Sequence, residues 1–218
     1  MTGTDSTLAK GRRTKVDQVV LGNVYNKYES RNPVARRLLR GYFAALTELC
    51  GKLAPARLLE VGCGEGYLTR TLCSWWPRAC VVGVDLSPDL FGVRDESSTT
   101  SRFLAQSVYE LGFAASSFDL VVAAEVLEHL EEPEPALDEI ERVARNYVVF
   151  SVPREPLWRV LNVIRLSYLR DWGNTPGHFQ HWSASAFRSL IGARFEIIAC
   201  RTPLPWTMLL ARKKHPPP

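Results

Sequence analysis

Hydrophobic and polar positions change their period along the chain. Between Val24 and Leu53 apolar residues recur every three or four positions, which predicts two helices, interrupted at Asn32-Pro33 and broken again near Gly51. After Arg57, short apolar runs alternate with helical or irregular segments. We expect strands at 57–61, 80–85, 102–105, 118–124 and 146–152. Such alternation is typical of a parallel sheet with helices on both faces.

The last part of the chain has a different pattern. Phe195 to Cys200 and Trp206 to Ala211 are strand-like, and they are joined through Pro203-Leu204-Pro205. A connection this short cannot hold a helix, so we expect the two strands to pair antiparallel. Upstream, Ser183 is expected to cap a helix that begins at Ala184. The predicted fold class is therefore α/β, with N-terminal helices and a doubly wound, mostly parallel seven-stranded sheet that ends in an antiparallel hairpin.

The composition is that of an ordinary globular domain. Of 218 residues, 46% are hydrophobic and 23% charged, which is enough apolar material for one core. We expect a flexible segment over 1–20, a single domain over 21–214 and a tail over 215–218. Within the domain, 21–55 is predicted to form the N-terminal helices and 153–192 a lid or acceptor-binding region.

Charge and cysteine usage narrow the class of protein. A net charge of +4 is too mild for a dedicated nucleic-acid binder. The five cysteines contain no closely spaced pair of the kind that binds zinc or cycles as a disulfide, so a reducing compartment is expected. The first twenty residues lack the apolar stretch of a signal peptide, and no run approaches a membrane span. These features predict a cytoplasmic protein.

The segment from Leu58 to Arg70 carries the most informative chemistry. A buried strand containing Glu60 leads into a glycine-rich turn and then a helix, whose first N–H groups can receive a polar ligand. Asp85 ends the next strand, about twenty residues further on, where a carboxylate usually binds ribose hydroxyls. The G-x-G-x-G spacing differs from the dinucleotide pattern G-x-G-x-x-G. A carboxylate beside this turn suits an ammonium group better than a pyrophosphate.

These two elements resemble the first two motifs of the class I S-adenosylmethionine-dependent methyltransferases, a family with a Rossmann-like fold. The resemblance implies that the glycine turn holds the methionine part of the cofactor. It continues over 103–133, although Ser107 stands beside Gln106 where many relatives carry an aspartate near the adenine. A nicotinamide-dependent oxidoreductase on the same fold is the alternative. The expected cofactor-binding residues are Glu60, Gly62, Cys63, Gly64, Gly66, Asp85, Leu86, Gln106, Ser107 and Glu125.

A second group of polar residues follows the fourth predicted strand. If a helix begins at Glu125, then Glu128 and His129 share its face, because they lie three and four positions later. The arrangement resembles O-methyltransferases of ubiquinone biosynthesis and small-RNA 2′-O-methyltransferases. That resemblance implies a divalent metal, such as magnesium, held by Glu125, Glu128, His129 and His181. His129 and His181 are alternatively the catalytic general bases, and helix-capping acids beside a solvated histidine are the simplest structural interpretation.

Residues 153–172 combine apolar side chains with interleaved arginines, and read as a helix they have one broad apolar side and a basic edge. Packing on the domain accounts for such a face, and peripheral membrane contact through 154–172 is the functional alternative. The predicted activity is O-methylation of a small hydroxylated aromatic, quinone-like or natural-product acceptor. RNA 2′-O-methylation is the alternative, which the modest charge disfavours. The oligomeric state is left open.

Overall fold

The computed structural model describes residues 32–86, 101–166 and 168–214. Seven strands form one sheet in the order β3-β2-β1-β4-β5-β7-β6. The strands β1 to β5 run parallel, whereas β7 pairs antiparallel with both β5 and β6. Their bounds are β1 Arg57–Val61, β2 Cys80–Asp85, β3 Ser101–Ala105, β4 Phe118–Ala124, β5 Ala144–Pro153, β6 Phe195–Arg201 and β7 Trp206–Lys213. The predicted fold class is confirmed.

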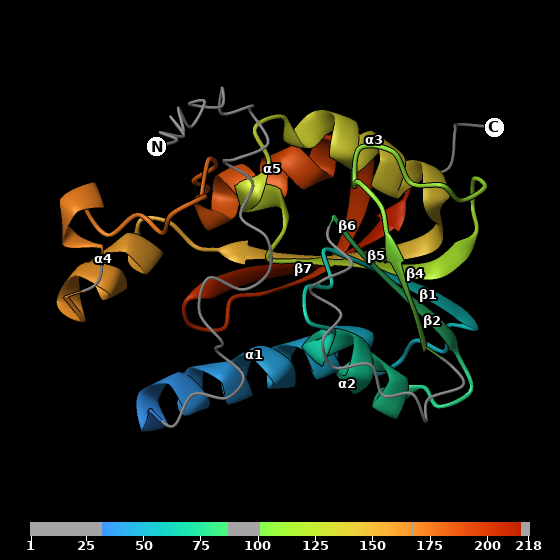
Figure 1. Cartoon of the computed structure of the whole chain (residues 1–218), viewed down its shortest axis with the longest axis horizontal. Helices are drawn as coiled ribbons and strands as arrows, with labels where there is room; N and C mark the ends of the chain where they lie inside the picture. The colour runs from blue at the N-terminus through green and yellow to red at the C-terminus, as the bar shows by residue number, and fades with distance from the viewer. Residues whose placement is uncertain (1–31, 87–100, 167, 215–218) are drawn as a thin grey trace, which may run out of the picture.

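Helices cover both faces of the sheet. The helices α1 (Pro33–Cys50) and α2 (Tyr67–Trp75) lie on one face, and α3 (Pro133–Val143) and α5 (Ala184–Arg194) on the other (Figure 1). Each face has its own buried apolar cluster. The helix α4 (Leu157–Ile164) lies at one end of the molecule, away from the helices that cover the two faces (Figure 1). No helix in the described ranges is long and apolar enough to cross a membrane.

The predicted helix boundaries have clear physical causes. The Asn32 side chain accepts a hydrogen bond from the Val34 N–H at 2.9 Å, and proline at the next position needs no such partner. The helix then ends at Gly51, as expected. At α5 the Ser183 hydroxyl accepts from the Ala186 N–H at 3.2 Å, which confirms the predicted cap.

The parallel register brings the ends of the first four strands to one edge of the sheet. Glu60 of β1 is level with Gly83 of β2 and Val122 of β4. At the far end, Asp85 pairs with Ala105, and the Gln106 N–H donates to the Asp85 carbonyl at 2.9 Å. Ligands of open α/β sheets bind at this carboxyl edge. The predicted cofactor residues therefore share one edge although the sequence spreads them over 66 positions, from 60 to 125.

Two local predictions are wrong. No helix begins at Glu125, which has a left-handed φ of 60° and is followed only by the short 3-10 helix η4 (Leu127–His129). The predicted helix over 153–172 is confined to α4, and the 3-10 helix η5 (Leu169–Asp171) follows it. The buried Asn162 amide explains the second difference. It donates to the Gly173 carbonyl at 2.9 Å and to the Thr175 hydroxyl at 3.3 Å, which ties the following segment back against α4.

Several predictions concern residues that the structure does not describe. The flexible segment over 1–20, the helix expected before Asn32 and the tail over 215–218 all lie outside the described residues.

Candidate cofactor and acceptor site

A cavity of about 540 Å³ lies at the carboxyl edge of the sheet. Its walls come from the glycine turn after β1, the ends of β2 and β3, the η4 segment, the start of α1, and α4 with the loop behind it. Most of the exposed lining is apolar, with few polar groups among it, as in small-molecule sites. Predicted cofactor residues in the lining are Glu60, Gly62, Cys63, Gly64, Asp85, Leu86, Gln106 and Glu125.

The backbone of the glycine turn lies in the left-handed region of φ, which is strained for residues other than glycine. Gly62, Gly64 and Gly66 have φ values of 69°, 50° and 79°. A Cβ on Gly62 would lie 2.4 Å from a Val126 methyl group, and one on Gly66 would lie 2.7 Å from the Phe103 ring. Two of these glycines are therefore also required by packing. The turn is held by the Gly62 and Cys63 N–H groups, which both donate to the Val84 carbonyl.

Glu60 is a buried carboxyl group beside this turn. Only 3% of the residue is exposed, and the Thr69 hydroxyl donates to its Oε2. Burial raises the pKa of Glu60 to about 8, and the nearby Asp85 carboxylate acts in the same direction, whereas the Thr69 hydrogen bond opposes both. A cationic ligand next to Glu60 would favour the ionised form. The site thus suits the ammonium of an amino-acid moiety.

Asp85 is fixed by two backbone hydrogen bonds. Its Oδ2 accepts from the Gly64 N–H and its Oδ1 from the Leu86 N–H, each at 2.8 Å. Each oxygen retains a second lone pair, so the carboxylate is preorganised to accept from two hydroxyl groups of a ribose. Leu86 is half exposed beside it and also lines the cavity.

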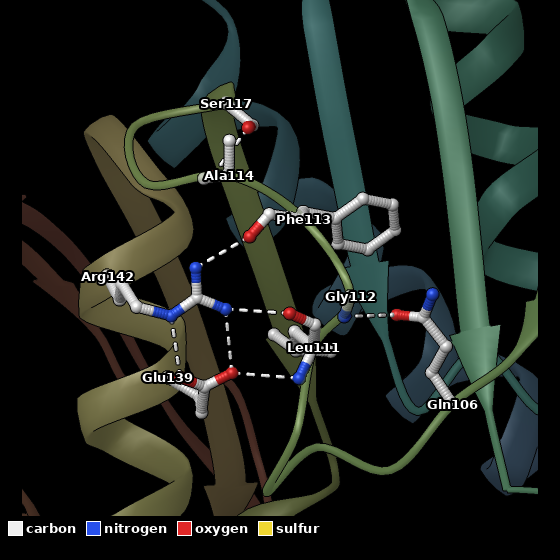
Figure 2. A network of polar contacts seen from close by, with 8 residues as sticks. All are labelled: Gln106, Leu111, Gly112, Phe113, Ala114, Ser117, Glu139 and Arg142. Carbon is white, nitrogen blue, oxygen red and sulfur yellow. Dashed lines mark hydrogen bonds and ion pairs between the residues drawn. The ribbon is translucent and has the colours of Figure 1, made fainter.

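Gln106 and Ser107 face different surroundings. Gln106 lines the cavity, and its Oε1 accepts from the Gly112 N–H at 3.2 Å (Figure 2). The Ser107 hydroxyl instead accepts from the Tyr109 N–H at 3.2 Å within its own turn, and Ser107 is absent from the cavity lining among the residues described. Of the two predicted adenine contacts, the structure brings only Gln106 to the cavity.

An ion pair on α3 holds the loop that carries Gln106. The Arg142 guanidinium pairs with Glu139 at 2.6 Å and donates to the carbonyls of Phe113 and Leu111, while the Leu111 N–H donates to Glu139 at 2.8 Å (Figure 2). These hydrogen bonds lower the pKa of Glu139. Sequence reasoning missed this pair, since an i, i+3 Glu–Arg pair is common on any helix surface.

Glu125 lines the cavity, but its carboxylate is also part of the scaffold. Its Oε2 accepts from the Trp206 indole N–H at 2.7 Å and its Oε1 from the Ser151 hydroxyl at 3.2 Å. Ser151 in turn lies 2.8 Å from the Tyr42 hydroxyl of α1. The left-handed backbone of Glu125 places its side chain among α1, β5 and β7, away from a shared helical face with Glu128.

The predicted metal or base residues are only partly brought together. Glu128, His129 and His178 each offer a ligand atom, and these atoms lie within 4.8 Å of one another. His129 Nδ1 lies 2.9 Å from the Gly177 carbonyl, which can only accept, so in the neutral imidazole the proton is on Nδ1 and the lone pair on Nε2. His178 contacts the His129 ring edge-on at 4.8 Å and stacks on Trp158 at 6.2 Å between ring centroids.

His181 lies elsewhere. Its Nε2 is 2.7 Å from Asn174 Oδ1, and the residue is absent from the cavity lining in the described part of the chain. Burial, together with the Arg159 charge, lowers the pKa of His181. The structure thus gives His178 the position that the sequence prediction assigned to His181. Both histidines belong to one short loop, and residue type alone does not distinguish them.

The outer part of the cavity is aromatic and aliphatic. Trp158 of α4 and Trp206 of β7 lie 5.9 Å apart between ring centroids, and the Trp158 indole N–H donates to the Thr175 hydroxyl at 2.9 Å. Apolar residues from the start of α1 face this part as well, including Val34 and Leu38. One cavity therefore joins a polar, cofactor-like half to an apolar half between α1 and α4.

Comparison with known proteins agrees with this geometry. Residues 59–151 match the family model described as a methyltransferase domain. The ubiquinone biosynthesis O-methyltransferase of Xanthomonas oryzae pv. oryzae is 32% identical over 125 residues, which cover 54% of this chain and 52% of that protein. The malonyl-[acyl-carrier protein] O-methyltransferase of Paenibacillus sp. is 28% identical over 103 residues, covering 44% and 37%. The matches thus span about half or less of these relatives.

A solved structure supports the same fold. Magnesium protoporphyrin IX methyltransferase from Synechocystis, crystallised with bound S-adenosylhomocysteine, superposes with a TM-score of 0.63 at 19% identity. The superposition covers 85% of this chain and 89% of that one. At this identity the likeness concerns the fold. Together with the family match over the glycine turn and the strands that flank the cavity, it leads to one conclusion: residues 59–151 of this chain are similar to the methyltransferase-domain family, on a fold shared with S-adenosylmethionine-dependent methyltransferases.

Proposed function

We propose that the protein transfers the methyl group of S-adenosylmethionine to an oxygen atom of a small hydroxylated acceptor that is aromatic, quinone-like or a related natural product. The observation that carries the proposal is one cavity that is lined both by the carboxyl groups of Glu60 and Asp85 and by the imidazoles of His129 and His178. The names of the relatives, which are O-methyltransferases, point the same way.

The cofactor supplies an electrophilic sulfonium methyl group, and the protein's own residues bind and align the reactants. Glu60 suits the ammonium group, Asp85 the ribose, and the glycine turn keeps side chains away from the ligand. Holding two reactants in line contributes several kcal/mol to catalysis in comparable systems. Trp158 and Trp206 offer apolar surfaces on which an aromatic acceptor can pack.

The imidazoles are the groups that act on the acceptor. With its proton on Nδ1, His129 has a basic Nε2 that can take the proton of a hydroxyl group. Two imidazoles and a carboxylate within reach of one another also fit a divalent cation, and nitrogen donors favour manganese or zinc over magnesium. We infer that Glu128, His129 and His178 would hold such a cation, which when bound lowers the pKa of the acceptor hydroxyl.

Calorimetric titration with S-adenosylhomocysteine tests the cofactor assignment directly. We expect micromolar binding that a chelator leaves unchanged, because the candidate cation cluster consists of Glu128, His129 and His178 and includes neither Glu60 nor Asp85. An acceptor screen with methyl-labelled cofactor then follows, with chelator and with added manganese, zinc or magnesium. Absence of binding would contradict the proposal and favour the dinucleotide alternative, for which NAD should raise the melting temperature. Turnover that a chelator does not slow would remove the cation and leave the general base.

The exposed surface that continues outward from the cavity wall at Ile164 and Arg165 suggests where such an acceptor is delivered. Ile164, Leu166 and Trp172 are 71%, 78% and 81% exposed, and arginines 159, 165 and 170 lie among them. Apolar side chains next to cations suit an anionic lipid surface. We propose that this face contacts such a membrane, from which a lipid-soluble acceptor can enter between α1 and α4.

A further inference from the structure

The loop over residues 174–182 lies against the η4 segment and carries His178 to the cavity wall. Its backbone contacts with η4 converge on one atom. The N–H groups of Phe179 and Gln180 both donate to the Glu128 carbonyl, at 2.8 and 3.1 Å. Two hydrogen bonds to a single oxygen fix a point of attachment but leave the loop able to pivot about it.

The side chain of Gln180 adds two further points of attachment. Its Nε2 donates to the carbonyls of Leu130 and Glu131, at 3.1 and 3.0 Å. Both partners can only accept, so the NH₂ end of the amide must face them, and both of its N–H groups are used. Gln180 is absent from the cavity lining in the part of the chain that the structure describes, so the side chain acts from outside the cavity.

The docked loop determines how the two imidazoles are presented. Glu128 and His129 come from η4 and His178 from the loop, and their ligand atoms lie within 4.8 Å of one another. The loop also supplies the Gly177 carbonyl, which lies 2.9 Å from His129 Nδ1 and keeps the proton there in the neutral ring. An unconstrained histidine side chain prefers the proton on Nε2. Release of the loop would therefore separate the rings and reverse the tautomer of His129.

We propose that Gln180 is a positioning residue that holds the loop against η4, and so sets both the contact between His129 and His178 and the tautomer of His129. The proposal rests on the proposed function, in which this arrangement presents a basic Nε2 to the acceptor. It predicts that a substitution outside the cavity slows methyl transfer and leaves cofactor binding unchanged.

The first test is nuclear magnetic resonance of the full chain with nitrogen-15-labelled histidine, metal-free and at pH 8, where imidazoles of ordinary pKa are neutral. Gln180→Glu keeps the length of the side chain, but the ionised carboxylate cannot donate and repels the two carbonyl oxygens. In the wild type we expect the proton on Nδ1 of His129 and a nuclear Overhauser contact between the His129 and His178 rings, whose centroids are 4.8 Å apart. In Gln180→Glu we expect the proton on Nε2 and loss of the ring contact.

The second test separates kcat from KM, with the acceptor that the screen identifies. We expect the kcat of Gln180→Glu to fall by about 10- to 100-fold, because a displacement of about 1 Å at a reacting group can cost this much. The KM for the acceptor and the Kd for S-adenosylhomocysteine should change by less than about threefold. Gln180→Met removes the donors without adding a charge, and it should change the tautomer, the ring contact and kcat in the same direction.

Ser183→Ala is the matched control, because it removes a hydrogen bond at the end of the same loop, the 3.2 Å cap of α5, and leaves the contacts with η4 in place. It should lower the melting temperature but keep the wild-type tautomer, ring contact and kcat. An unchanged tautomer and ring contact in folded Gln180→Glu would overturn the assignment, as would an equal loss of kcat in Ser183→Ala. Failure of the wild type to bind S-adenosylhomocysteine would instead refute the proposed function, and the two spectroscopic measurements would still decide the role of Gln180.

Discussion

The two halves of the cavity are built in different ways. In the cofactor half, Asp85 and Gln106 are held by backbone hydrogen bonds at strand ends, and Glu60 is almost completely buried. In the acceptor half, the segment after α4 leaves Leu166 and Trp172 largely exposed, both with a left-handed backbone. One half depends on a regular sheet, and the other on side-chain hydrogen bonds within an irregular loop.

Because of this difference, the shape of the cofactor half is constrained by the sheet, whereas the shape of the acceptor half is not. Sheet register fixes the positions of the cofactor-binding groups relative to one another, because Glu60 and Asp85 lie on neighbouring strands of the sheet. The acceptor wall comes from one short helix and its return loop, tied by the buried Asn162. Its shape can change without disturbing the sheet. We therefore expect variants in the two halves to affect different measurements.

The largest effect should come from the imidazoles of the acceptor half. In His129→Ala and His178→Ala we expect turnover of the screened acceptor to fall by about 10²–10⁴-fold, because proton transfer or hydroxyl orientation is lost. The affinity for S-adenosylhomocysteine should change little. His181→Ala is the control, since His181 bonds to Asn174 outside the cavity lining, and it should retain most activity. A loss in His181→Ala as large as in His178→Ala would show that the structure-based choice between them is mistaken.

The cofactor half should show its largest effect in stability. Gly62→Ala introduces a Cβ 2.4 Å from Val126 at a φ of 69°, so strain and overpacking should lower the free energy of unfolding by roughly 3 to 4 kcal/mol. Gly41→Ala is the matched control. It lies within α1, where a Cβ meets nothing within 4 Å, and it should stabilise the protein by up to about 1 kcal/mol. Denaturant unfolding of the two variants measures the difference.

The sequence predicted the cofactor half better than the acceptor half for a physical reason. Periodic apolar runs located every strand, and strand ends fixed the positions of Glu60 and Asp85. The choice between His178 and His181, and the conformation of Glu125, depend on contacts with residues far along the chain, such as Trp206. No local pattern encodes those contacts. Likewise, Asn162 shortens the helix predicted over 153–172 through bonds to a loop that periodicity does not reveal.

The raised pKa of Glu60 should make the stability of the folded protein depend on pH. Its carboxyl group has a folded pKa of about 8 against an ordinary value of 4.5, so the folded protein binds more protons than the unfolded chain between these values. Stability should therefore fall as pH rises through this window, by on the order of 4 kcal/mol, because each pKa unit corresponds to about 1.4 kcal/mol. Glu60→Gln should flatten this dependence and weaken S-adenosylhomocysteine binding. Thermal melts at pH 5, 6.5 and 8 measure it, and an unchanged slope in the variant would assign the dependence to other groups.

The smallest effect concerns the exposed face beside the acceptor half. Leu166→Ser and Trp172→Ser remove apolar area outside the cavity lining, so each should reduce binding to vesicles of anionic lipid by roughly threefold to tenfold. Ile198→Ser is the control, because this residue is 45% exposed on β6, in a different part of the sheet. Cosedimentation with anionic and with neutral vesicles measures the change. Equal losses in all three variants would indicate nonspecific hydrophobic adsorption, whereas a loss confined to the first two would assign the lipid contact to this face.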